Sequence, residues 1–72
     1  MNKDANLVAF GKRLRSIRKE KKLTQAKLAE MVDMSTNFIG MIERGHRNTT
    51  IDKMFKIVTA LDVTLNKFFE NM

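Results

Sequence analysis

The sequence predicts an all-α fold, a compact domain of five helices with a helix-turn-helix at its centre. Apolar residues recur every three or four positions along most of the 72-residue chain, which is the spacing of one helix face. A chain of this length is enough for one domain. A Thr or Ser of the kind that caps helix N-termini stands before four of the five periodic segments: Thr24, Ser35, Thr50 and Thr64.

The first predicted helix lies in a domain formed by residues 7–72, after a flexible N-terminus of residues 1–6. Its apolar stripe consists of Leu7, Phe10, Leu14 and Ile17. Seven of the fourteen Lys and Arg residues lie between positions 12 and 22, and the net charge of the chain is +6. This charge favours a polyanionic partner, either nucleic acid or an anionic membrane, although a merely solvated helix face has the same composition.

The next two predicted helices, at about residues 25–32 and 36–44, form the helix-turn-helix. In the first of them Leu28, Ala29 and Val32 share one face, and in the second Ile39 and Ile42 do so. The three residues between the helices, 33–35, are too few for a loop between independent elements. The chain must therefore bend sharply there.

The outward face of the second of these helices carries few charges, which is unusual for a helix that is only solvated. An amide, a hydroxyl, a thioether and a position without a Cβ suit the edges of DNA bases better than water. The alternative is an exposed helix of an ordinary bundle. The predicted base-contacting residues are Thr36, Asn37, Gly40 and Met41.

Two further helices are predicted near the C-terminus. The fourth has apolar positions at Ile51, Met54, Phe55, Val58 and Leu61. The fifth contains the adjacent residues Phe68 and Phe69. Neighbouring positions differ by about 100° around a helix, so one of the two should face the domain and the other should lie near its rim. An apolar rim suits a two-fold dimer. The predicted dimer interface is Leu65, Phe68 and Phe69.

Four strings between Phe10 and Phe69 carry a family resemblance: FGKRLRSIRKEKKLTQ, LAEMV, ERG and VTALDVTLNKFF. Together they resemble the Cro/C1-type (XRE-like) helix-turn-helix family of phage and bacterial regulators. The string ERGHRNTTI also resembles restriction–modification controller proteins, which are small dimeric members. The resemblance implies a lambda-repressor-like domain that binds double-stranded DNA and regulates transcription, as a homodimer on a palindromic operator.

The resemblance also implies roles for single residues. Arg18 is expected to form an internal ion pair with Glu43, the alternative being an Arg18 that is free to bind phosphate. Asp33 and Asp62 stand where relatives have residues with positive φ, usually glycine. Gln25 is the first residue of a predicted helix, where backbone N–H groups attract phosphate. In relatives, residues at the end of the second helix of the helix-turn-helix, called the recognition helix, contact the sugar–phosphate backbone of DNA. The predicted phosphate contacts are Gln25, Lys27, Arg44, His46, Arg47 and Asn48.

Other classes of function find little support. Without cysteine there can be no disulfide or thiolate metal site, and the single histidine has no partner at ligand spacing. No set of residues suggests a nucleophile or base, so we expect no enzyme, no cofactor and no small-molecule effector. No apolar run reaches the roughly 20 residues of a membrane helix, and a cytoplasmic location is expected. Two alternatives remain open, an antitoxin-like protein-interaction module and peripheral membrane association through the basic helix.

Overall fold

Five helices and no strand make up the part of the chain that the computed structural model describes, residues 4–70 and 72. The predicted all-α, five-helix class is confirmed. Residues 1–3 of the predicted flexible segment lie outside the described part, whereas Ala5 and Asn6 belong to the first helix, which Asp4 caps by accepting the Asn6 N–H at 2.7 Å. The helices are α1 (Ala5–Glu20), α2 (Gln25–Met31), α3 (Thr36–Glu43), α4 (Ile51–Ala60) and α5 (Leu65–Phe68).

The four predicted caps start the last four helices. In each case the hydroxyl oxygen of the cap accepts a hydrogen bond from the backbone N–H three residues later, which satisfies a group that has no partner inside the helix. The donor–acceptor distances are 3.0 Å for Thr24 and Ser35 and 3.1 Å for Thr50 and Thr64. The helix starts were therefore determined locally.

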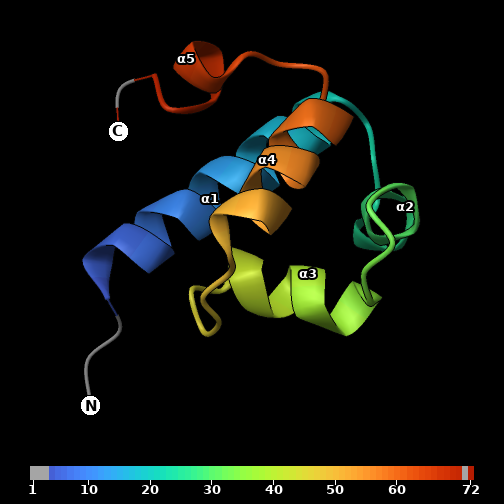
Figure 1. Ribbon diagram of the computed structural model, residues 1–72, viewed down its shortest axis with the longest axis horizontal. Helices are drawn as coiled ribbons and strands as arrows, with labels where there is room; N and C mark the ends of the chain where they lie inside the picture. Colours follow the sequence, from blue (N-terminus) through green and yellow to red (C-terminus); the bar gives the residue numbers. More distant parts are fainter. Residues whose placement is uncertain (1–3, 71) are drawn as a thin grey trace.

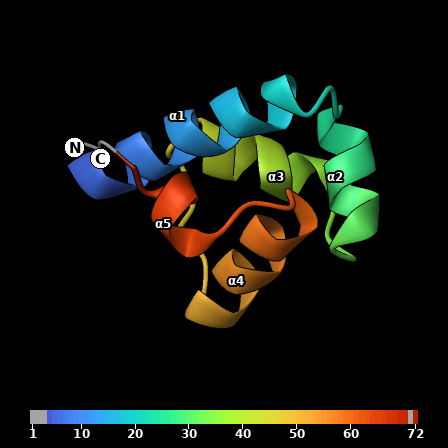
Figure 2. The ribbon, with the colours of Figure 1, turned by 90° about the horizontal axis from the view of Figure 1, so that it is seen from above.

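In Figure 1 α3 lies below the long helix α1, against which it packs, and α4 overlaps α1 in the view, but Figure 2 shows α1 and α4 on opposite sides of the molecule. Seen from above, α2 lies at one end of the molecule and α5 lies beside α1 toward the other end (Figure 2). Every helix contributes to a single core between them. Its buried apolar residues are Phe10, Leu14, Ile17, Leu28, Ala29, Val32, Ile39, Ile42, Ile57, Val58, Leu61 and Phe68.

The predicted core face of α4 was partly wrong. Ile51 is 68% exposed and Phe55 is 44% exposed, whereas Ile57, which was not predicted to face the core, is completely buried. Both stripes have helical spacing, and the first turn of α4 projects beyond the neighbouring helices. Periodicity alone could not choose between two adjacent faces.

The first four helices each end with one residue in the left-handed region. Asp33 (φ 57°) and Asp62 (φ 59°) have the positive φ that the resemblance implied, and Lys22 (φ 61°) joins them. Only α3 uses glycine for this turn, Gly45 with φ 74°. A residue with a Cβ costs about 1–2 kcal/mol in this conformation, so three of these ends are formed at some expense of stability.

Gly11 lies where α1 crosses the end of α3. A Cβ at this position would lie 2.3 Å from the carbonyl oxygen of Ile42 and 2.6 Å from that of Glu43. We expect Gly11→Ala to lower the free energy of unfolding by about 1–3 kcal/mol, because a backbone cannot yield as a side chain can. Urea unfolding measures this, and an unchanged or higher stability would contradict the close crossing.

Candidate nucleic-acid interface

A buried ion pair joins α1 to the end of α3. Arg18 Nε lies 2.6 Å from Glu43 Oε2, and Arg18 Nη2 donates to Glu43 Oε1 at 3.0 Å. The third nitrogen, Nη1, donates to the carbonyl oxygen of Leu23 at 2.7 Å. The side chains are only 8% and 1% exposed. The structure thus contains the expected ion pair, and all three guanidinium nitrogens of Arg18 are engaged inside the protein.

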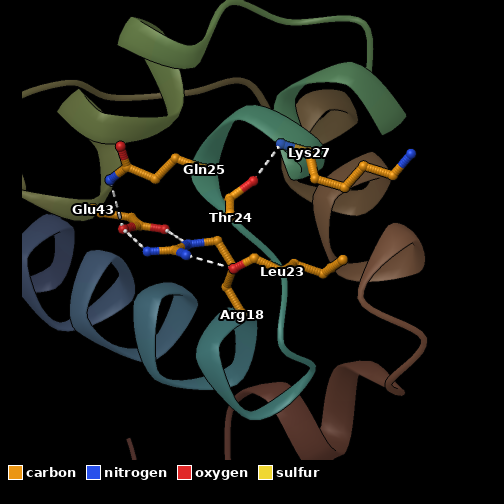
Figure 3. A network of polar contacts seen from close by, with 6 residues as sticks. All are labelled: Arg18, Leu23, Thr24, Gln25, Lys27 and Glu43. Carbon is orange, nitrogen blue, oxygen red and sulfur yellow. Dashed lines mark hydrogen bonds and ion pairs between the residues drawn. The ribbon is translucent and has the colours of Figure 1, made fainter.

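Gln25 extends this network to α2. Its Nε2 donates to Glu43 Oε1 at 3.0 Å, and Arg18 and Gln25 approach the carboxylate from opposite sides (Figure 3). The first residue of α2 is therefore bound to the last residue of α3. This bond holds the two helices of the helix-turn-helix at a fixed angle, a role that the sequence did not reveal.

The outward face of α3 has the composition predicted for it. Thr36 and Asn37 are exposed and Met41 is half-buried, with Asn37 Nδ2 3.6 Å from Met41 Sδ. Gly40, in contrast, is buried, so the prediction that it contacts bases directly needs correction. The Arg44 side chain covers it, because long side chains on a helix extend toward the helix N-terminus and cover the preceding turn.

Two cations gather around Phe38 at the edge of this face. The Arg47 guanidinium carbon lies 5.5 Å from the centre of the ring, and Lys53 Nζ lies 5.0 Å from it. Cation–π attraction holds both charges beside the recognition helix. Lys53 was missed in the sequence, where its position in the first turn of α4, directly after the polar loop, was the available signal.

The remaining predicted phosphate contacts are Lys27, His46 and Asn48. Lys27 and His46 are exposed, and Lys27 Nζ pairs with Glu30 at 3.0 Å. Asn48 is exposed as well, but its Oδ1 accepts the Thr49 N–H at 2.8 Å and so shapes the loop. Of these three side chains, only that of Lys27 has an acidic neighbour that a phosphate would have to displace.

The predicted dimer interface needs one correction. Phe68 is fully buried and packs on Phe10, with ring centres 5.1 Å apart, so it belongs to the core. Leu65 and Phe69 are 45% and 37% exposed. One of the two neighbouring phenylalanines faces the domain and the other its rim, as expected from their angular separation. Leu65 and Phe69 remain available to a partner.

Arg13 is a basic residue of α1 with a structural role that sequence reasoning missed. Its Nε donates to the carbonyl oxygen of Phe68 at 2.6 Å, and its Nη2 donates to that of Lys67 at 2.7 Å. These are carbonyls at the end of α5, which have no partner inside the helix. Arg13 therefore fastens α5 to α1.

None of the helices in residues 4–70 is both long and apolar enough to cross a membrane. Within the same part of the chain, no three His, Cys, Asp or Glu side chains are grouped so that they could hold a metal ion.

Comparison with known proteins identifies the family. A profile of the helix-turn-helix family matches residues 14–68. The chain belongs to this family. Among helix-turn-helix relatives, the control protein C.MunI of Mycoplasma sp. is 33% identical over 66 residues, which cover 90% of this chain and 89% of that protein.

Solved helix-turn-helix structures agree with this assignment. The restriction-modification controller protein C.AhdI from Aeromonas hydrophila is similar with a TM-score of 0.86 at 39% identity, over 92% of this chain and 100% of that one. The controller protein C.Esp1396I, solved as a tetramer in complex with its natural 35 base-pair operator, gives 0.86 at 34% identity, over 93% and 88%. The chain is thus a DNA-binding transcriptional regulator, and these relatives are regulators, not enzymes.

Proposed function

We propose that this protein is a controller-type regulator that binds a two-fold symmetric operator as a homodimer and controls a restriction–modification operon. The observation that carries the proposal is the outward face of α3, an uncharged strip flanked by cations. Its DNA partner implies a cytoplasmic location. Similarity to controller proteins, one of them solved on its operator, supports the assignment.

The uncharged strip supplies the choice of sequence. Asn37 can form two hydrogen bonds with adenine, and the methyl group of thymine can contact Thr36 or Met41. The Asn37 amide donates to the sulfur of Met41, which is a weak acceptor. The amide can therefore turn to a base at little energetic expense.

The surrounding cations supply affinity that does not depend on sequence. Arg44, Arg47 and Lys53 border the strip, and the chain carries a net charge of +6. Each contact to a DNA phosphate releases a counterion, so the binding constant falls as the salt concentration rises. Gln25, Lys27, His46 and Asn48 are proposed as further backbone contacts at the two ends of the helix-turn-helix.

Selection of bound duplexes from a random pool tests the proposed function. We expect enrichment of a sequence with two inverted half-sites about one helical turn apart, or a multiple of it. A pool that shows no enrichment, together with co-purification of a protein partner, would favour the antitoxin-like alternative. Binding to anionic vesicles without binding to duplex DNA would favour the membrane alternative.

Asn37→Ala should relax discrimination at one base pair of each half-site. A good bidentate contact contributes about 1–3 kcal/mol of discrimination, so the selected and mixed-sequence duplexes should move closer in affinity. Arg47→Ala is the matched control, because losing a phosphate contact weakens all duplexes together and lowers the salt dependence. Equal losses on both duplexes for Asn37→Ala would show that Asn37 does not read bases.

A further inference from the structure

Gly40 lies in the middle of α3, where glycine destabilises a helix relative to alanine. Unlike Gly11, it does not meet the backbone of another helix. The three atoms nearest to a Cβ built on Gly40 all belong to side chains, one of Arg44 and two of Gln25. Close packing of helix backbones therefore does not explain this glycine.

Arg44 lies across the surface that Gly40 leaves open. It is the C-cap residue of α3, and its side chain extends back over the preceding turn. Arg44 Nη1 is only 3.1 Å from the position that a Cβ on residue 40 would take. An alanine would require the guanidinium to shift by a few tenths of an ångström, which it can do because it is the far end of a flexible side chain.

Gln25 borders the same position from α2. Its Oε1 is 3.4 Å and its Nε2 is 3.6 Å from the Cβ position of residue 40. The Nε2 is bound to Glu43, which Arg18 in turn holds (Figure 3). The buried ion pair therefore fixes the Gln25 amide. The Arg44 guanidinium and this amide both lie next to the Cβ position of Gly40, at the junction of the two helices.

We infer that Gly40 is a positioning residue whose missing side chain seats the Arg44 guanidinium on α3, beside Gln25, where it binds one phosphate of the DNA backbone. The inference rests on the proposed DNA-binding function and names a determinant of it. A guanidinium already held against a helix loses less conformational freedom on binding than a free one. Its planar donors suit phosphate oxygens. Gly40 thus lowers the stability of α3 but leaves the space in which the Arg44 guanidinium is held in place.

A double-mutant cycle tests this inference on the whole chain, with the selected duplex and a mixed-sequence duplex of equal length as probes. Gly40→Ala should weaken binding to both duplexes by about three- to tenfold, the effect of one misplaced charge-assisted contact. The slope of log K against log salt should become shallower, but by less than the change of about 1 expected for Arg44→Ala, because the shifted guanidinium keeps its charge. In the Arg44→Ala background, Gly40→Ala should have no effect on affinity.

Stability separates this role from a packing role. Gly40→Ala should unfold at the same or a higher urea concentration than the wild type, whereas Gly11→Ala should unfold at a lower one. Three outcomes would overturn the inference: unchanged affinity and salt slope, an equal loss of affinity without Arg44, or a lowered urea midpoint. The second would mean that the Cβ itself blocks approach to the groove. If the wild type binds no duplex, the proposed function is wrong. If the wild type binds and Gly40→Ala changes neither the affinity nor the salt dependence, only this inference is wrong.

Discussion

Removal of either Arg18 or Glu43 is expected to lower the free energy of unfolding by about 3–5 kcal/mol. Each single substitution leaves the other charge buried without its partner, and the remaining side chains are nearly inaccessible to water. Loss of Glu43 also removes the acceptor of Gln25. A loss of this size is a large part of the stability of so small a domain, so Arg18→Met and Glu43→Leu should unfold readily in urea.

The double variant Arg18→Met/Glu43→Leu keeps this prediction testable. Replacing a buried ion pair by apolar residues of similar size is often close to neutral, because the desolvation of both charges is avoided. The double variant should therefore be more stable than either single variant. Additive losses would mean that the two charges do not depend on one another. DNA binding of the folded double variant should still fall, because Gln25 is no longer held.

Phe68→Ala is expected to lower the free energy of unfolding by about 3–5 kcal/mol, the usual effect of truncating a buried aromatic side chain. Phe68 is fully buried against Phe10 and has no surface to offer a partner. Phe69→Lys and Leu65→Lys should behave differently. Both side chains lie on the exposed rim, so these variants should remain helical but dimerise less and bind the operator more weakly.

Circular dichroism and sedimentation equilibrium separate the two effects. The expected pattern is loss of helix for Phe68→Ala in mild urea, and folded monomers for Phe69→Lys or Leu65→Lys. Lys67→Glu is a control on the exposed side of the same helix, although it reverses a charge that pairs with Glu70. If the wild type is monomeric at high micromolar concentration, or if both rim variants stay dimeric, the interface does not lie on α5.

The sequence determined where the last four helices begin and where two of them, α2 and α4, end. Each cap satisfies a backbone group three residues away, and Asp33 and Asp62 take positive φ directly after a helix. The caps depend only on near neighbours, so local patterns are sufficient to predict them, whereas the positive φ of the two aspartates was implied by the family resemblance. The family motif added the Arg18–Glu43 pair, which no periodicity would have revealed.

The tertiary structure decided which of several equivalent side chains became structural and which stayed at the surface. Arg13 binds carbonyls 54 and 55 positions away, and Gln25 binds a carboxylate 18 positions away. Helical spacing left two faces open for α4, and the neighbouring helices selected the one with Ile57. These outcomes depend on the angles between packed helices. A sequence pattern records the faces of single helices, and only packing decides what each face meets.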